Sequence, residues 1–375
     1  MANRRDFLYK SILGTAGMVA APSIINAANS TETAIPSAKI KNNFLRDKFK
    51  PEWKFGMGGV AAGNGFHENS DEDIRGAMDA AWNNGVRYFD TSPWYGLGIS
   101  ERRMGSYLFN KKLEDFVLST KVGRVLTPDP DFELPGALWK GKLNMNYKYD
   151  YSAEGVRKSV EQSLHRLGLA YIDIVFIHDL SPDNPDFKEG DYEKYFEQAK
   201  NGAMPELTKM REEGLIKGWG LGVNTTRPIL ETIEVADPDI FLSAKQYSML
   251  VHEDDLNNVF PVCENEGISL VIGAPLNAGF LAGKERYNYG GTIPEEMKEK
   301  RAKLQKVADK HNVDLRTAAL QFSAAPDVVA SVIPGASNGE QSEANAKSMD
   351  VKIPKAFWKE LKSKGLIAEN APEPK

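Results

Sequence analysis

Cysteine, histidine and dense runs of basic residues are all scarce in this chain. Cys263 is the single cysteine, which excludes an intrachain disulfide and any cysteine-clustered metal site. The 5 histidines include no HxH or HExxH pair, so a metal-dependent barrel hydrolase is poorly supported and no metal site is predicted. Because no Lys/Arg-rich run occurs and the net charge is -5, nucleic acid is not expected as a partner.

The N-terminal apolar run, Ile12–Ile25, is too short to span a membrane. It follows the arginine pair in Asn3–Lys10 and precedes Ala27 and Ala28, which is the charged, apolar, small-residue order of a signal peptide. The first segment resembles the twin-arginine export signal. The alternative is a chance arginine pair before a core helix.

These features divide the chain into three parts. We predict a twin-arginine signal peptide over residues 1–28, a polar linker over residues 29–51 and a barrel domain over residues 52–375. The twin-arginine machinery carries folded proteins, so the expected location is the periplasm. If the leader is not functional, the protein is expected to be cytoplasmic.

Eight short apolar runs follow the linker. They are mostly β-branched and continuous, as strands buried on both faces should be. They are Lys54–Val60, Val86–Asp90, Phe116–Val122, Ile172–His178, Ile216–Val223, Ile240–Tyr247, Ile268–Ala274 and Val328–Ile333.

Helical patterns separate these runs, and Ser152 is a candidate N-cap for one of them. Eight βα units predict an α/β fold, a parallel (β/α)8 TIM barrel with extended βα loops at its C-terminal face. An open doubly wound sheet is the alternative, but no GxGxxG follows the first strand. Helices are expected at 71–82, 155–167, 205–213, 228–235, 254–265, 295–310, 314–323, 339–349 and 354–364.

Polar residues stand where three of these strands end, and barrel active sites lie at that face. Asp90 ends the second strand, Lys121 the third and His178 the fourth, while Tyr95 follows Asp90 on a glycine-rich bend. A lysine inside an apolar strand is costly to bury unless an acid pairs with it, and Asp90 is the obvious partner. The alternative is an ion pair that only holds the barrel mouth together beside a core histidine.

Such groups can move a proton. A tyrosine has an ordinary pKa of about 10, which a close ammonium is expected to lower. His178 could donate to a substrate oxygen, so the set predicts acid–base chemistry at a carbonyl or hydroxyl oxygen. No activated nucleophile is visible and the chain has no redox group of its own, so hydride from a nicotinamide cofactor fits.

The segments FDTSPWYGLGISE, STKVGR and DIVFIHDL, with their four polar residues, resemble the aldo-keto reductases. The resemblance covers nearly the whole chain after Lys54. It implies a barrel that binds NAD(P)(H) extended across its mouth. It also implies Tyr95 as the acid/base, with Asp90, Lys121 and His178 as its catalytic partners.

The family's cofactor-binding residues are matched less completely in this sequence than its catalytic residues are. The run LNAGFLAG looks like a loop that covers the pyrophosphate, and IPGAS looks like the adenosine end. Many members stack an aromatic ring on the nicotinamide where this chain has Gly273. The positions implied for the cofactor are Asn224, Gln246, Ala274, Pro275, Leu276, Asn277, Gly279, Leu281, Gly283, Gly335, Ser337, Gln341 and Asn345.

The choice between NAD and NADP depends on cations, because a 2′-phosphate needs charge-assisted donors. The resemblance implies Lys or Arg at the adenosine end when a 2′-phosphate is bound. At the corresponding positions this chain has Gly335, Asn338 and Gln341, and the nearest cation along the chain is Lys347. The sequence therefore favours NAD over NADP, with use of both left open.

Within the family the chain resembles the D-threo-aldose (L-fucose) dehydrogenase branch. That implies oxidation of a sugar hemiacetal at C1 to the lactone, and pyridoxal oxidation is similar chemistry. The substrate is expected to be a small carbonyl compound or sugar, with Trp94 either stacked on a sugar face or packed in its loop. Residues 125–151 and 180–204 are expected to shape the substrate pocket. An NADPH-dependent carbonyl reductase and a cofactor-binding sensing or regulatory subunit are the alternatives.

Overall fold

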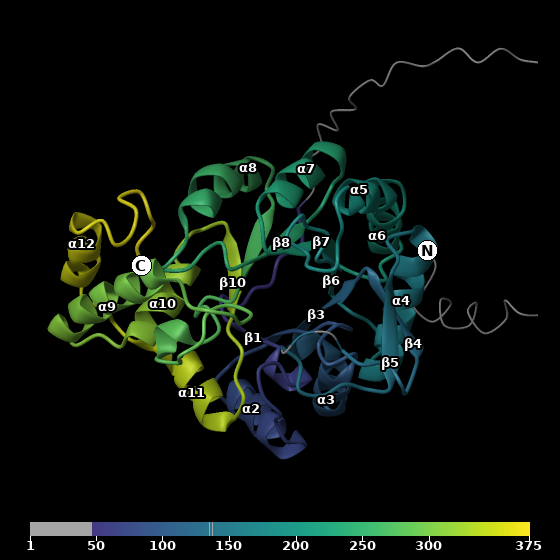
Figure 1. Cartoon of the computed structure of the whole chain (residues 1–375), viewed down its shortest axis with the longest axis horizontal. Helices are drawn as coiled ribbons and strands as arrows, with labels where there is room; N and C mark the ends of the chain where they lie inside the picture. Colours follow the sequence, from purple (N-terminus) through teal and green to yellow (C-terminus); the bar gives the residue numbers. More distant parts are fainter. Residues whose placement is uncertain (1–46, 135, 137) are drawn as a thin grey trace, which may run out of the picture. The chain divides into compact units, whose positions relative to one another are not determined.

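The structure is a computed structural model that describes residues 47–134, 136 and 138–375. The predicted twin-arginine signal peptide and residues 29–46 of the predicted linker lie outside the described residues. Residues Lys48–Lys375 form one compact unit (Figure 1). Among the described helices, none combines the length and apolar character that crossing a bilayer requires.

Eight parallel strands form one sheet that closes on itself, which confirms the predicted (β/α)8 barrel. The last strand returns to the first through the bridges Phe55–Val332 and Gly58–Gly335. In sheet order the strands are β1 (Gly56–Gly58), β2 (Tyr88–Asp90), β3 (Val117–Val122), β6 (Ile174–His178), β7 (Gly218–Val223), β8 (Ile240–Ala244), β9 (Ser269–Gly273) and β10 (Val329–Ile333).

Helices surround the barrel (Figure 1) and bury their apolar stripes against it. The predicted cap is confirmed, because the Ser152 hydroxyl accepts from the Gly155 amide at 3.1 Å. The α-helices are α2 (Asp71–Asn83), α3 (Ile99–Leu108), α4 (Ala153–Leu167), α5 (Asp191–Asn201), α6 (Ala203–Glu212), α7 (Arg227–Val235), α8 (Phe260–Asn265), α9 (Glu295–Lys310), α10 (Leu315–Ala324), α11 (Gly339–Lys347) and α12 (Lys355–Ser363).

Several boundaries differ from the sequence prediction. The first and sixth barrel strands are shorter than expected, so Gln246 lies beyond the strand that it is predicted to end. The segment after β3 contains an antiparallel hairpin, β4 (Arg124–Pro128) with β5 (Met145–Tyr149). The segment after β6 contains α5. Both additions follow the C-terminal ends of barrel strands, so they build the rim of the mouth.

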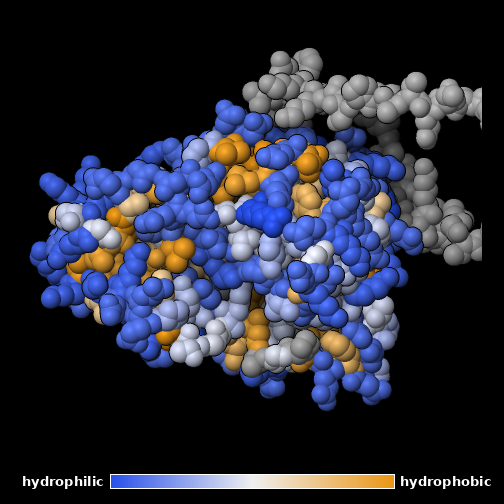
Figure 2. Space-filling model, turned by 45° about the horizontal axis from the view of Figure 1, so that its top comes forward, coloured by the Kyte–Doolittle hydropathy of each residue, from blue (hydrophilic) through white to orange (hydrophobic). Residues whose placement is uncertain are grey.

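The inside of the barrel is filled by apolar side chains, and its N-terminal end is closed. Phe49 and Trp53 pack against the inner cluster, and the Lys48 ammonium donates to the carbonyl of Pro238 at 2.7 Å. The C-terminal end is therefore the open one. On the face drawn in Figure 2, hydrophilic residues surround separate hydrophobic areas.

Candidate active site

A buried ion pair joins β2 to β3, as the sequence predicts. The Lys121 ammonium lies 2.7 Å from Asp90 Oδ2, and both side chains are almost fully buried. The ammonium also donates to the Thr91 carbonyl at 2.8 Å, while the Ser119 hydroxyl donates to Asp90 Oδ1 at 2.6 Å. Burial raises the pKa of Asp90 and lowers the pKa of Lys121, and their attraction offsets part of each shift.

Tyr95 stands beside this pair. The Lys121 ammonium lies 4.6 Å from the centroid of the Tyr95 ring, and the His178 ring packs edge-on against it at 5.8 Å. Among the described residues the Tyr95 hydroxyl forms no hydrogen bond. The structure therefore brings all four predicted catalytic residues together and leaves the hydroxyl available to a ligand.

The pKa of Tyr95 lies well above its ordinary value, opposite to the direction expected from Lys121 alone. Burial is the largest cause, and the negative charges of Asp90 and Asp179 add to it. Burial also lowers the pKa of His178 well below its ordinary value, helped by the nearby cations Lys121 and Arg124. At neutral pH the site therefore holds a neutral phenol and a neutral imidazole.

His178 is held from two sides. Its Nδ1 lies 3.1 Å from the Ser92 hydroxyl, and its Nε2 lies 3.6 Å from Asp179 Oδ1. Asp179 in turn accepts from the buried guanidinium of Arg124 at 2.8 Å. Sequence reasoning missed both Asp179 and Arg124. The acid directly after the strand-end histidine was the one available signal.

Aromatic rings from the β4–β5 hairpin and its loop form a wall beside Tyr95. The Trp139 ring lies 5.6 Å from the Tyr95 ring, and Tyr147 packs edge-on against Trp94 at 4.9 Å. The Arg124 guanidinium lies 4.5 Å from the Trp94 ring centroid. One face of Trp94 is therefore already covered, which favours the packed interpretation of this residue.

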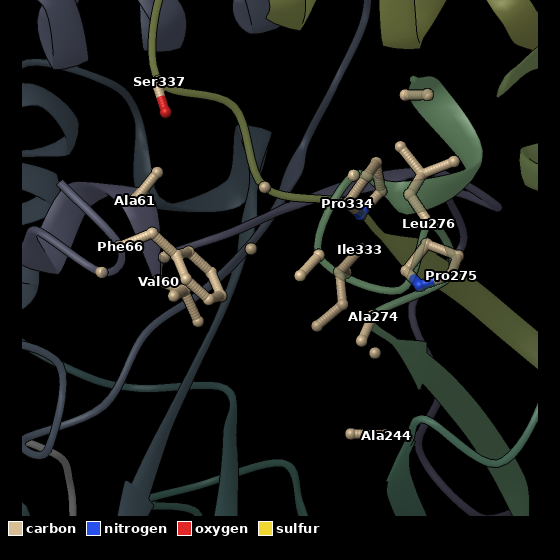
Figure 3. A pocket seen from close by; sticks show the side chains of 18 of the residues that line it. Val60, Ala61, Phe66, Ala244, Ala274, Pro275, Leu276, Ile333, Pro334 and Ser337 are labelled. Carbon is tan, nitrogen blue, oxygen red and sulfur yellow. The ribbon is translucent and has the colours of Figure 1, made fainter. Parts of the chain in front are cut away.

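A cavity of about 320 Å³ extends from the catalytic residues across the barrel mouth. Figure 3 shows Val60, Ala61 and Phe66 on one side of it, with Ala274 and Pro275 on the other. The predicted residues that line it are Asp90, Tyr95, Ala274, Pro275, Leu276, Gly279, Gly335, Ser337, Gln341 and Asn345.

The other predicted cofactor residues lie outside this lining. Asn224 and Gln246 contact each other through a hydrogen bond from the Gln246 amide to the Asn224 carbonyl. Asn277, Leu281 and Gly283 shape the loop after β9. Asn277 is buried and bonded to another residue of that loop, Leu281 belongs to the core, and Gly283 has a φ of 81°.

The same loop supplies an aromatic residue that sequence reasoning missed. Tyr289 lines the cavity, and its hydroxyl donates to Asn224 Oδ1 at 3.1 Å. Gly273, at the end of β9, also lines the cavity and carries no ring. The chain therefore does bring an aromatic side chain to this wall, from a later position in the sequence.

Among the described residues three cations line the cavity, and sequence reasoning found none of them: Lys284, Arg286 and Arg316. Lys347, the cation suggested by distance along the chain, pairs with Glu343 and does not line it. The Arg316 Nε atom is buried and has no hydrogen-bond partner in the described part of the chain. An elongated cavity with cationic donors and a proton-transfer group fits an anionic dinucleotide.

Comparison with known proteins agrees with this geometry. The profile of the aldo/keto reductase family matches residues 54–365. The D-threo-aldose 1-dehydrogenase of Pseudomonas sp. is 33% identical over 83% of this chain and 94% of its own length. The pyridoxal 4-dehydrogenase of Microbacterium luteolum is also 33% identical, over 84% of this chain and 94% of its own length.

A solved structure shares the fold. The aldo-keto reductase AKR11C1 from Bacillus halodurans (holo form) superposes with a TM-score of 0.64 at 23% identity, covering 87% of this chain and 99% of that one. The chain belongs to the aldo/keto reductase family, and it is an NAD(P)-dependent oxidoreductase. Within the described residues, no group of three or more His, Cys, Asp or Glu could hold a metal ion.

Proposed function

We propose that the enzyme oxidises an aldose such as L-fucose at C1 to the lactone. The observation that carries this proposal is the free Tyr95 hydroxyl at the cavity, beside the Asp90–Lys121 pair and a neutral His178. Two relatives at 33% identity, named for aldose and pyridoxal oxidation, support a substrate that presents a hemiacetal.

Tyr95 is the group that exchanges a proton with the substrate. A bound nicotinamide cofactor supplies the hydride acceptor in this chemistry. For oxidation Tyr95 must first lose its proton, and its raised pKa makes the phenolate more abundant as pH rises. The C1 hydroxyl then gives its proton to the Tyr95 phenolate while the C1–H bond breaks and the C1–O bond becomes the lactone carbonyl. His178, kept neutral, is positioned to hydrogen-bond that oxygen. Lys121 is the cation beside the phenolate, and Asp90 holds it in place.

Two polar atoms in the aromatic wall near Tyr95 are unpartnered. Trp139 Nε1 and Arg124 Nε are both buried without hydrogen-bond partners among the described residues. Buried donors of this kind cost free energy unless a ligand or water satisfies them. Neither residue lines the cavity, so these two atoms do not distinguish a sugar from a simple aldehyde.

Carbonyl reduction is the second candidate, and the pKa of Tyr95 favours it. A phenol whose pKa is raised holds its proton at neutral pH and is therefore ready to donate it to a carbonyl oxygen. In that direction the enzyme acts as an NAD(P)H-dependent reductase of aldehydes. A sensing or regulatory role is the third proposal, and it predicts cofactor binding without turnover.

For the cofactor we propose that both nicotinamide dinucleotides bind. Gly335, Asn338 and Gln341 offer no charge at the adenosine end, which favours NAD. Arg316 lines the same cavity and offers the 2′-phosphate of NADP a cationic partner.

Export by the twin-arginine route is a further part of the proposal. It rests on Arg4 and Arg5 and on the apolar run that follows them. Fractionation of cells should place a chain shortened by about 28 residues in the periplasm. Replacing both arginines with lysine should leave the full-length chain in the cytoplasm, and an unprocessed wild-type chain there would contradict the proposal.

The test of activity uses the purified protein with L-fucose and either NAD or NADP, following the absorbance of the reduced nicotinamide. A rise that Tyr95→Phe abolishes, with cofactor affinity unchanged, is the expected result. Pyridoxal is the parallel substrate. Turnover only of NAD(P)H with simple aldehydes would replace the proposal with carbonyl reduction, and cofactor binding without any turnover would support the sensing role.

A further inference from the structure

Arg316 is a cation with little to bind inside the protein. It is the second residue of α10 and lines the cavity together with Ser337, Gln341 and Asn345. Its guanidinium forms no hydrogen bond to any described residue, and its Nε atom is buried. A guanidinium carries five N–H donors in a planar fork, so an unsatisfied one beside a cavity points to an acceptor on a ligand.

Asp314 is an acid close to Arg316, and it is only a partial partner. Its Oδ2 lies 3.4 Å from Arg316 Nε, which is within ion-pair range but forms no hydrogen bond. The same oxygen caps α10, accepting from the Thr317 amide at 3.0 Å and from the Thr317 hydroxyl at 2.7 Å. The guanidinium therefore keeps its donor capacity for a ligand.

The neighbours of Arg316 in the cavity are donors as well. Gln341 Oε1 accepts from the Ser337 amide at 3.1 Å, which leaves the Gln341 NH2 group free to donate. The Ser337 hydroxyl lies 3.3 Å from His67 Nε2. A set of donors around one cation selects a compact anion over a neutral hydroxyl or a purine ring.

We propose that Arg316 binds the 2′-phosphate of NADP and thereby decides how well the enzyme uses NADP relative to NAD. The inference rests on the proposed cofactor chemistry of this cavity. Figure 3 places Ser337 and Ala244 on opposite sides of the pocket. Lys284 and Arg286 line the same cavity and are left for the pyrophosphate.

The test measures binding of NADP and of NAD to Arg316→Met by isothermal titration calorimetry. Loss of a charge-assisted bidentate contact should weaken NADP about 10- to 100-fold while NAD changes less than about twofold. Lys347→Met is the matched control, because it removes an exposed cation of α11 that does not line the cavity. It should leave both affinities unchanged.

Two further variants separate phosphate binding from a merely structural role. Arg316→Lys keeps a charge and should retain part of the NADP affinity. Asp314→Asn keeps a good helix cap but removes the competing carboxylate, so NADP should bind a few-fold more tightly. Adenosine 2′,5′-bisphosphate should compete with NADP on the wild-type protein far better than 5′-AMP.

Equal weakening of NADP and NAD in Arg316→Met would overturn the inference and assign Arg316 to the pyrophosphate or the adenine. Unchanged affinity for both would overturn it as well. Failure of the wild-type protein to bind either dinucleotide would instead contradict the proposed function. If Arg316→Met does not fold, the Asp314→Asn and Arg316→Lys affinities decide the question alone.

Discussion

The buried pair at the centre of the site gives the sharpest prediction. Lys121→Met replaces the lysine with an uncharged side chain of similar length, so Asp90 loses its ion-pair partner. The Asp90 carboxylate keeps its hydrogen bond from the Ser119 hydroxyl. Both charges are almost fully buried, and removing one partner of such a pair costs about 3–5 kcal/mol. We therefore expect Lys121→Met to lower the free energy of unfolding by about that amount at neutral pH.

The cost should depend on pH in a defined direction. Burial already raises the pKa of Asp90, and removing the ammonium raises it further. A folded-state pKa above the unfolded value means that the folded protein holds the proton more tightly. The stability that this proton contributes to Lys121→Met is therefore fully present below about pH 4, the ordinary aspartate pKa, and is lost as pH rises through the folded pKa.

Urea unfolding followed by tryptophan fluorescence measures this directly. The double variant Asp90→Asn with Lys121→Met leaves no charge buried, so it should be more stable than the sum of the two single changes implies. Lys298→Met, in the exposed pair with Glu295, should cost less than about 1 kcal/mol. A Lys121→Met protein as stable as the wild type at pH 7, or strict additivity in the double variant, would refute the reasoning.

The remaining predictions concern three other sites. Burial raises the pKa of Asp255 to about 7, so its contribution to stability is present below about pH 4 and lost as pH rises through 7. Asp255→Asn should make the urea concentration at the unfolding midpoint depend less on pH, because it removes a pH-dependent contribution to the free energy of unfolding on the order of 4 kcal/mol. Gly123 has a φ of 109°, and a Cβ there would lie 2.4 Å from the Tyr151 ring. Gly123→Ala should therefore cost more stability in urea than Gly168→Ala, where φ is 63° and nothing lies within 4 Å. Because the pKa of Tyr95 is raised, sugar oxidation should accelerate between about pH 7 and 9 while carbonyl reduction does not. Initial rates in both directions check this, and a pH-independent oxidation would contradict it.

The convergence of the predicted catalytic residues at one end of the barrel could be inferred from sequence, because the C-terminal ends of parallel barrel strands lie at the same face. Asp90, Lys121 and His178 lie on neighbouring parallel strands, and continuous apolar runs mark those strands. Parallel pairing then brings the strand ends to one mouth. The pairing of Lys121 with Asp90 could likewise be inferred, because a charge inside an apolar run needs a partner.

The secondary structure at the rim of the barrel mouth could not be predicted in this way. Strand β5 is half-buried along most of its length, so its side chains do not alternate between apolar and polar. In α5 only Tyr192 and Ala199 are buried, which is too few to form an apolar stripe. Secondary structure of this kind is stabilised by tertiary contacts, including the rings of Tyr151 and Phe187 packed around Tyr149.

The electrostatics of the site could not be predicted for a related reason, since a sequence shows neighbours along the chain but not across the fold. The expectation of a lowered pKa for Tyr95 considers only the ammonium of Lys121. In the folded site, burial and the carboxylates of Asp90 and Asp179 raise this pKa instead. Distance along the chain suggests Lys347 as the phosphate-binding cation, but in the fold Lys347 pairs with Glu343. Arg316 is further from Gln341 in sequence, yet both line one cavity because α10 and α11 are in contact. We propose that the preference between NAD and NADP depends on these two packed helices, and comparing the affinities of Arg316→Met with those of Lys347→Met tests that proposal directly.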